Sequence, residues 1–346
     1  MSEPPMRIVG APGSPYSRKL RAVLRYRRIP HAWINQGWPE TGGLPQPRVQ
    51  LLPQLVFPGP DGALIVRTDS SPLIRELERT HPGRSVIPPD PVAAFLDHLL
   101  EDYGDEWLTK AMFHYRWAFE ADANNAASIL PRWFRIDQSE EAAVAGGRGF
   151  AARQIGRLGV VGSNATTGPL IEESYVRFLH LLDAHLTHTP FLFGQRPASS
   201  DFGIFGQLTQ LVGFDPTPTA IARREAPRVV AWVDVVEDLS GLEPDERPWT
   251  APGSLPATLR ELLAEVGRVY APFLVANAAA LASGAERVEC TIDGRIWVQK
   301  PFPYQGKCLQ WLREAHEALA PEARGTVDAI LAGTGCEVLF APPGRS

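Results

Sequence analysis

The feature that most constrains this chain is a short apolar strand that runs directly into an amphipathic helix. Residues 7–10 are the expected strand, and residues 10–24, GAPGSPYSRKLRAVL, form a turn and then a helix. Pro15 suits the first helical position, because its missing N–H would be unpaired there, and Ser14 is therefore the expected N-cap. The apolar side chains of this helix recur on one face and its basic side chains on the other. The turn thus places a serine hydroxyl at the positive end of a helix, where it can stabilise a sulfur anion.

Two more predicted strands and a second helix follow within the next 60 residues of the sequence. Residues 51–57, LLPQLVF, predict a strand headed by Pro53. Residues 58–62, PGPDG, are a hairpin signal, and the next four residues, ALIV, predict a fourth strand. Residues 67–78, RTDSSPLIRELE, then open a second helix at Asp69 and Ser70. The free N–H groups and the dipole of that helix favour an anion at its start.

The order Ser-Pro, Leu-Pro, Asp-Ser within the first 80 residues resembles the glutathione S-transferase family with a serine-type active site. The resemblance implies an α/β, thioredoxin-like N-terminal domain and an all-α second domain, with glutathione as co-substrate. It implies that Ser14 hydrogen-bonds the glutathione thiol. Leu52, ahead of a cis Pro53, would pair through its backbone with the cysteinyl part. Ser70 would hold the γ-glutamyl carboxylate, with Asp69 near the ammonium group.

Each of these motifs also has a plain structural interpretation. Ser14 can be only a helix cap, Pro53 a trans proline at a strand start, and the Asp-Ser pair an ordinary N-cap. Tyr16 and Ser17 carry hydroxyls that compete with Ser14 for the thiol, and Ser17 ranks below Ser14 because it lies a turn into the helix.

One position departs from the family pattern. Relatives often carry a lysine for the glycyl carboxylate of glutathione where this chain has Leu51. Arg48 or Gln50 is the candidate replacement. If neither replaces it, glutathione binds weakly or the fold serves another purpose.

The rest of the chain divides at two proline-rich stretches. We expect a glutathione-binding domain over residues 1–81, a helical substrate domain over 92–243, and an α+β extension over 257–346. The helix after the first linker is expected to form the wall that faces the serine turn. Its candidate pocket residues are Tyr103, Trp107, Met112 and His114, each of which also suits an interhelical core.

Two segments of the helical domain are less regular. Residues 146–168 are glycine-rich but lack the Gly-Lys-Ser/Thr ending of a phosphate loop, and we expect a mobile surface loop there. Ala198 stands three residues before Asp201, where relatives carry Ser or Thr, so the reciprocal cap of the following helix is broken unless Ser199 substitutes.

The family resemblance implies no function for the C-terminal extension, residues 257–346. Its pattern predicts a helix over 259–281, a hairpin around Asp293 and Gly294, and an amphipathic helix over 307–319. A two-stranded hairpin is marginal without a surface to lie on. We therefore expect residues 257–346 to dock on the transferase core.

Composition narrows the function classes further. The net charge of −5 and a pI of about 5.9 give no basic footprint for nucleic acid. No signal peptide opens the chain, and the longest apolar stretch is too short to span a bilayer, so a cytoplasmic protein is expected. The three cysteines, Cys290, Cys308 and Cys336, include no Cys-x-x-Cys pair, and His185 and His188 lack a third ligand, so neither a disulfide framework nor a metal site is predicted.

These observations lead to a glutathione transferase-like enzyme that binds glutathione and a small hydrophobic electrophile. The resemblance implies a homodimer. Two alternatives stay open: a glutathione-dependent isomerase or dehalogenase on the same scaffold, and a non-catalytic module that uses the fold for binding or assembly. No nucleic-acid or membrane partner is expected.

Overall fold

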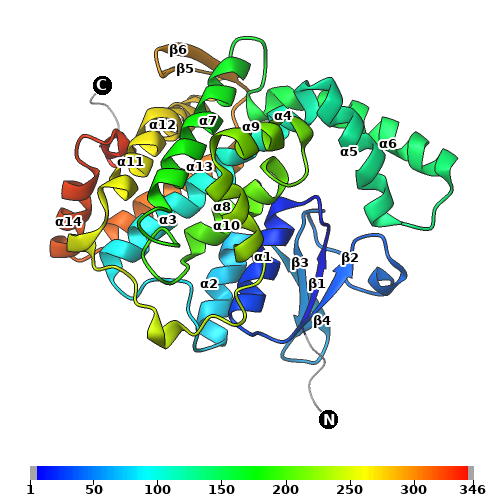
Figure 1. Ribbon diagram of the computed structural model, residues 1–346, viewed down its shortest axis with the longest axis horizontal. Helices are drawn as coiled ribbons and strands as arrows, with labels where there is room; N and C mark the ends of the chain where they lie inside the picture. Colours follow the sequence, from blue (N-terminus) through cyan, green and yellow to red (C-terminus); the bar gives the residue numbers. More distant parts are fainter. Residues whose placement is uncertain (1–5, 342–346) are drawn as a thin grey trace.

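The N-terminal domain is a four-stranded sheet with two helices, and the computed structural model describes residues 6–341 of the chain. Its elements follow in the order β1 (Met6–Gly10), α1 (Pro15–Tyr26), β2 (His31–Asn35), β3 (Gln54–Pro58), β4 (Leu64–Thr68) and α2 (Ser70–Thr80). The strand order is β2-β1-β3-β4, with β1 parallel to β2 and the other pairs antiparallel. The predicted thioredoxin-like domain is confirmed. In Figure 1 it lies at one side of the molecule in dark and light blue.

A helical region follows the sheet domain, as the sequence predicts. Its helices surround α8, which is buried along its whole length. They are α3 (Pro91–Glu106), α4 (Leu108–Ala118), α5 (Glu120–Phe134), α6 (Glu140–Ile155), α7 (Gly168–His185), α8 (Ser199–Leu211), α9 (Pro216–Glu225) and α10 (Pro227–Val236). The class is α/β followed by all-α, with an additional strand pair near the C-terminus.

The prediction of a surface loop over residues 146–168 is wrong in its first half. Residues up to Ile155 belong to α6, whose N-cap Ser139 accepts a hydrogen bond from the N–H of Ala142 at 3.2 Å. The glycines in this helix permit a close approach to α5, because a Cβ on Gly147 would lie 2.1 Å from the carbonyl oxygen of Ala127. Gly147 therefore allows two helices to pack closely and does not indicate a mobile loop.

Only one of the two reciprocal capping hydrogen bonds at the start of α8 is formed, the one that the Asp201 side chain accepts. The Asp201 carboxylate accepts hydrogen bonds from the N–H of Ala198 at 2.8 Å and of Leu192 at 2.9 Å. Ser199 does not supply the missing hydroxyl, because it donates instead to Asp97 on α3 at 2.6 Å. The start of α8 is therefore held by Asp201 and by a contact with α3.

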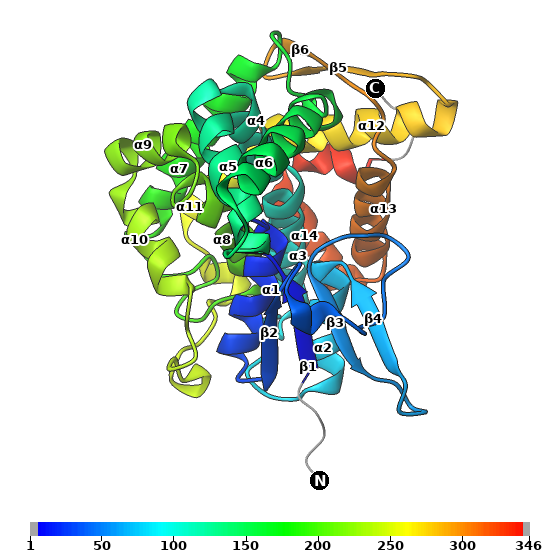
Figure 2. The same ribbon diagram turned by 90° about the vertical axis from the view of Figure 1, so that its right-hand side faces the viewer.

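The C-terminal extension is mostly helical and contains the predicted hairpin. It comprises α11 (Ala257–Glu265), a π-helical turn (Val266–Tyr270), α12 (Ala271–Ser283), β5 (Val288–Ile292), β6 (Arg295–Gln299), α13 (Pro303–Glu317), α14 (Pro321–Leu331) and a short 3-10 helix (Cys336–Leu339). Asp293 and Gly294 at the hairpin turn both have positive φ, +50° and +74°, as a two-residue turn of this type requires. Figure 2 shows α13 between this hairpin and the N-terminal domain.

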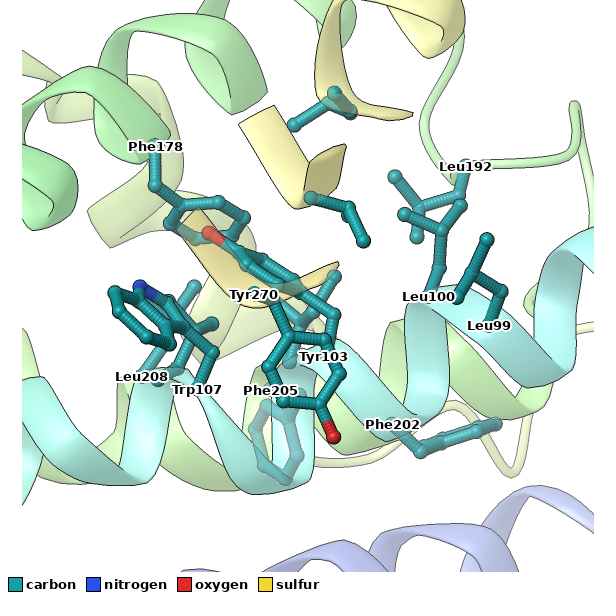
Figure 3. Packing of buried hydrophobic residues seen from close by; sticks show 14 of the residues in the cluster. Leu99, Leu100, Tyr103, Trp107, Phe178, Leu192, Phe202, Phe205, Leu208 and Tyr270 are labelled. Carbon is teal, nitrogen blue, oxygen red and sulfur yellow. The ribbon is translucent and has the colours of Figure 1, made fainter. Parts of the chain in front are cut away.

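The extension shares a hydrophobic core with the helical region. Trp107, on the α3–α4 junction, lies 5.3 Å from Trp297 of β6 and 6.4 Å from Tyr270, measured between ring centroids. Tyr103 contacts Tyr270 at 6.1 Å and Phe178 of α7 at 5.9 Å. Figure 3 shows Tyr270 inserted among Tyr103, Trp107 and Phe178. Residues from both ends of the chain thus belong to one continuous core.

One helical run, Ala257–Ser283, is long and apolar enough to cross a membrane by length and composition alone, with a mean hydropathy of 1.2. Its buried residues include Leu262, Tyr270 and Phe273, which lie in the core described above. In this fold the run is accommodated as core helices.

Candidate functional site

Ser14 lies at the start of α1 in the geometry that the sequence predicts. The N–H of Ser17 donates to its Oγ at 3.3 Å, and its own N–H donates to the carbonyl of Ala11 at 3.0 Å. Because Oγ accepts the capping bond, its O–H hydrogen is left free to donate. Pro15 follows at the first helical position. A hydroxyl donor at a positive helix end is a suitable partner for an anion.

The helical region fixes the turn before Ser14. Arg116 of α4 donates to the carbonyl of Gly13 at 3.2 Å, and Gln210 of α8 donates to the carbonyl of Pro12 at 3.1 Å. Arg116 is itself held by Asp215, with its Nε 2.9 Å from the carboxylate, and both side chains are buried. The position of the serine turn therefore depends on residues about 100 and 200 positions away.

A close approach between α1 and α8 also places the turn. A Cβ on Gly206 would lie 2.7 Å from the carbonyl oxygen of Pro15 and 3.1 Å from Cβ of Lys19. Any larger residue at position 206 would push the first turn of α1 outward. Glycine is required here by contact and not by backbone angle.

Ser14 opens into a cavity of about 400 Å³, which we call the serine cavity. Leu52 lies on its wall, and the Leu52–Pro53 bond is cis. Aromatic side chains from α4, α5 and α6 line the opposite side: Phe113, Trp117, Trp133, Phe134 and Phe150. The cavity combines the Ser14 hydroxyl and other polar side chains, among them Gln50 and Arg116, with an apolar wall, as a site for a thiol and a hydrophobic molecule would.

A second cavity of about 330 Å³, which we call the acidic cavity, is lined by Asp69 and Ser70 at the start of α2. The two cavities share five lining residues, among them Tyr16, Leu51 and Leu52, so they adjoin. Asp105 and Glu106 of α3 also line the acidic cavity. The structure thus distributes the residues predicted for glutathione over two neighbouring cavities with Leu52 in both; Pro53 is buried beside them.

Asp69 adopts a costly backbone conformation at the entrance of α2. Its φ of +81° lies in a region that residues other than glycine rarely occupy, and such positions occur often at functional sites. Its carboxylate accepts a hydrogen bond from the hydroxyl of Tyr304, on α13, at 2.8 Å. Burial raises the pKa of Asp69, although the bond from Tyr304 opposes this rise.

A buried ion-pair network connects the two domains below the acidic cavity. Lys19 of α1 is fully buried and lies 2.7 Å from Glu101 and 2.5 Å from Asp105. Ser71 donates to the same Asp105 carboxylate at 2.9 Å. Burial alone would lower the pKa of Lys19, but the two carboxylates outweigh it and the net change is upward. Lys19 therefore stays charged and holds α1 against α3.

The hydroxyls that compete with Ser14 are already engaged. Tyr16 lines both cavities, but its O–H donates to the carbonyl of Asp105 at 2.9 Å. Ser17 is fully buried, and its Oγ accepts from the N–H of Ala11 at 3.4 Å. Of the three, Ser14 is the one that both lines a cavity and keeps its O–H available.

The expected substrate-pocket residues need correction. Over the described range 6–341, neither cavity is lined by Tyr103, Trp107 or His114; the first two lie in the aromatic core, and His114 is buried against Ser163 at 2.7 Å. The prediction assumed one long helix, whereas the chain breaks between α3 and α4. After this break, the cavities are faced instead by Thr109, Lys110, Met112, Phe113, Arg116 and Trp117.

Of the residues at and near position 51, where relatives often carry a lysine, some line the cavities and some do not. Leu51 is half exposed and lines both cavities, and Gln50 lines the serine cavity. Arg48 lines neither cavity. Gln50 is thus the candidate replacement that the structure places at the site.

Within residues 6–341, no group of three or more His, Cys, Asp or Glu side chains is arranged to hold a metal ion. The three cysteines are free thiols, and burial raises the pKa of Cys290 to about 11 and of Cys336 to about 12.

Comparison with known proteins now identifies the N-terminal domain. Residues 8–85 match the family model described as glutathione S-transferase, N-terminal domain. This domain is therefore similar to the N-terminal domain of the glutathione S-transferases. None of the curated proteins matches the chain.

Solved structures with a similar fold of the chain include glutathione transferases at low sequence identity. A glutathione S-transferase from Methylobacterium radiotolerans, in complex with glutathione sulfonate, is 21% identical, covers 72% of this chain and 97% of its own, and has a TM-score of 0.42. A glutathione transferase from Pseudomonas putida with bound glutathione disulfide is 14% identical, covers 67% and 90%, and has a TM-score of 0.41. FzlA from C. crescentus is 17% identical, covers 75% and 92%, and has a TM-score of 0.40.

Proposed function

We propose that this transferase-family protein binds glutathione across its two adjoining cavities and uses Ser14 to hold the sulfur as a thiolate. The observation that carries the proposal is the free O–H of Ser14 at the start of α1, on a cavity that also contains Leu52 ahead of a cis proline. The thiol would lie in the serine cavity. The γ-glutamyl end would lie in the acidic cavity, with its carboxylate at Ser70 and its ammonium group near Asp69.

The free energies involved are of the required size. A free thiol has a pKa of about 8.5, and lowering it to about 6.5 takes about 2.7 kcal/mol of preferential thiolate stabilisation. A hydrogen bond to a charged acceptor contributes about 1.5–3 kcal/mol, and a helix N-terminus about 0.3–1 kcal/mol. Ser14 and the first turn of α1 therefore suffice without a general base.

The thiolate would attack an electrophile held against the aromatic wall of the serine cavity. The attack forms a carbon–sulfur bond with the sulfur electron pair, and the leaving group departs with its own pair. Phe113, Trp117 and Trp133 supply an apolar surface for this second substrate. Glutathione conjugation to a small hydrophobic electrophile is the reaction that this arrangement supports best.

The test compares Ser14→Ala with Ser17→Ala in conjugation of glutathione to an aryl halide at pH 6.5. Ser14→Ala is expected to lower the rate by tenfold or more, because it removes a hydrogen bond to a charged group. Ser17→Ala is the matched control, because Ser17 is buried beside the same turn. The assignment is overturned if Ser14→Ala keeps the wild-type rate, above all if Ser17→Ala is the variant that loses it.

A further inference from the structure

The acidic cavity contains a carboxyl group that the proposed reaction leaves unused. Glu106, the last residue of α3, lines this cavity and is 6% exposed. Its Oε2 accepts a hydrogen bond from Nε2 of Gln305, on α13, at 3.0 Å. Its Oε1 has no hydrogen-bond partner within residues 6–341 and keeps accessible surface, which opens onto the cavity that the side chain lines. Glu106 thus presents one free oxygen to a bound molecule.

Gln305 decides which oxygen of Glu106 can carry a proton. The nitrogen that bonds Oε2 also lies 3.3 Å from the main-chain carbonyl oxygen of Glu106. A carbonyl oxygen can only accept, so this end of the amide is the NH2 group. Oε2 is therefore an acceptor, and a proton on the carboxyl group is carried by Oε1. In its neutral form Glu106 points an O–H donor into the cavity.

The charges around Glu106 favour this neutral form. Its neighbours Asp102 and Asp105, on the same helix, are both acidic. The cation close to it is Lys110 of α4, whose Nζ donates instead to Oε1 of Gln299 at 3.0 Å. Burial raises the pKa values of the other titratable groups that lie close to it, so they are uncharged at neutral pH: Tyr16, Tyr270, Tyr304 and Cys308.

The pKa of Glu106 reflects these surroundings. Burial, together with repulsion from the two aspartates, raises it to about 8, although Gln305 and Lys110 oppose this rise. Burial also lowers the pKa of Lys110 to about 7, which weakens the one opposing charge. At neutral pH the carboxyl group of Glu106 therefore keeps its proton for most of the time. A group that holds a proton near the working pH is suited to donate it in a reaction.

Glu106 also lies next to the residues that the acidic and serine cavities share. Tyr16, two residues after Ser14, lines both cavities and donates its O–H to the carbonyl of Asp105, immediately before Glu106, at 2.9 Å. Thr109, at the start of α4, lines both cavities as well. A molecule held at the sulfur can therefore extend toward Glu106 between the two cavities, while the γ-glutamyl end of glutathione occupies the start of α2.

Proton donation matters for one class of electrophile. Displacement of a halide from an aryl ring needs no proton, because the halide leaves as a stable anion. Addition to an α,β-unsaturated carbonyl compound does need one. The thiolate pair forms a carbon–sulfur bond at the β-carbon, and the π pair of the double bond moves toward the carbonyl group. The product is an enolate that must gain a proton at its α-carbon.

We propose that Glu106 is the general acid of this site and that its second substrates are α,β-unsaturated carbonyl compounds. The Oε1 proton passes to the α-carbon of the enolate, Glu106 becomes a carboxylate, and it regains its proton from water. General acid catalysis contributes about 10²–10⁴-fold to a rate. Glu106 is the catalytic residue of this step, and Gln305 is a positioning residue that leaves the proton on Oε1. The inference rests on the proposed function, whose thiolate it uses.

The test compares two electrophiles on the full chain with saturating glutathione: trans-4-phenyl-3-buten-2-one, an enone, and 1-chloro-2,4-dinitrobenzene, an aryl halide. Glu106→Gln keeps the size of the side chain but has no proton to transfer. It is expected to lower kcat for the enone by about tenfold or more, and kcat for the aryl halide by less than about threefold. The KM for glutathione should stay within about threefold of the wild-type value.

The matched control is Asp102→Asn, one turn earlier on α3. Asp102 accepts a hydrogen bond from the hydroxyl of Tyr270 at 2.6 Å, burial raises its pKa to about 7, and it lines neither cavity. This variant is expected to leave the ratio of the two rates unchanged, because it removes an acid that does not reach a substrate.

The wild-type protein provides a second measurement, which remains valid if Glu106→Gln does not fold. The ratio of the enone rate to the aryl halide rate cancels the titration of the sulfur, because both reactions use the same thiolate. A general acid is active only while it is protonated, so the ratio should fall as the pH rises through the Glu106 pKa of about 8. The enone rate, unlike the aryl halide rate, should also be lower in D2O.

The outcomes separate this inference from the proposed function. Equal losses for both electrophiles in Glu106→Gln, or a loss confined to the KM for glutathione, would show that Glu106 only supports the cavity wall and would overturn the inference. A wild-type rate ratio that does not change through pH 8, or conjugation of the aryl halide without the enone, would also overturn it. In each case the proposed function stands. If the wild-type protein conjugates neither electrophile, the proposed function itself fails.

Discussion

At the scale of single residues, the position of the turn before Ser14 depends on a buried charge pair, of which Arg116 also lines the serine cavity. Arg116 donates to Asp215, to Gln210 and to the carbonyl of Gly13, immediately before Ser14. Burial raises the pKa of Asp215, although the positive charge of Arg116 opposes this rise. The pair is costly to bury and still more costly to break.

A double substitution can separate the contribution of the Arg116–Asp215 pair to stability from its contribution to the position of the turn before Ser14. Arg116→Met should lower the free energy of unfolding by about 3–5 kcal/mol, because Asp215 is left buried and unpaired. Arg116→Met with Asp215→Leu should recover most of that loss, since an apolar pair of similar volume carries no uncompensated charge. Conjugation should stay impaired in both, because Gly13 and Gln210 have lost their donor. Urea unfolding and initial rates measure the two effects. A double variant as unstable as the single one would contradict this account.

Residues that act through local sequence were predictable, and residues that act across the fold were not. Ser14 as an N-cap and the turn at Asp293 follow from neighbouring residues, whereas the cis bond before Pro53 was implied by the family resemblance. Arg116, Gln210 and Tyr304 reach the site from about 100 to 240 positions away, and nothing in their own surroundings in the sequence shows where they point.

At the scale of secondary-structure elements, glycine content misled the interpretation of α6. A glycine-rich segment is usually a loop, because glycine costs about 0.5–1 kcal/mol relative to alanine inside a helix. Here only some of the glycines serve a contact: Gly147 meets the backbone of α5, whereas a Cβ on Gly149 would have open space around it. The sequence pattern could not distinguish these two positions.

This difference predicts opposite effects for two substitutions two residues apart in the same helix. Gly149→Ala should raise the free energy of unfolding by about 0.5–1 kcal/mol, because alanine is the better helix former. Gly147→Ala should lower it by about 1–3 kcal/mol, because its methyl group overlaps the carbonyl of Ala127 and forces α5 and α6 apart. Denaturant midpoints of the two variants and of the wild type provide the measurement. A stabilising effect of both alanines would show that α5 and α6 are not in close contact.

A second element-scale difference concerns the helix that follows the first linker. The sequence predicts one helix there that faces the serine turn, whereas the apolar side chains of α3, such as Leu99 and Tyr103, belong to its core side. The helix is interrupted at Trp107, and the cavities are lined by Asp105 and Glu106 before the interruption and by residues from Thr109 onward after it. Periodicity gives the buried face of a helix but not the place where the helix is interrupted or which of its other residues line a cavity.

At the scale of the whole molecule, the extension and the transferase core form one hydrophobic interior. Trp297 of the hairpin is fully buried against Trp107 and Phe273, and Ile8 of β1 belongs to the same buried cluster as Leu339 near the C-terminus. The sequence indicated three segments through its proline-rich linkers. It could not show their cooperativity, because that depends on which apolar faces meet.

Shared interior surface predicts that the chain unfolds as a unit. Trp297→Ala should lower the free energy of unfolding by about 3–5 kcal/mol, since it leaves a large cavity beside Trp107. Because β1 and β3 belong to the same cooperative unit, hydrogen exchange at their amides should accelerate to match this loss, although they lie in the other domain. Trp311→Ala on α13 is the matched control, because that tryptophan is 37% exposed. Calorimetry should show a single transition in both variants. Two separate transitions, with exchange in β1 and β3 unchanged by Trp297→Ala, would show instead that the extension is an independent unit resting on the transferase fold.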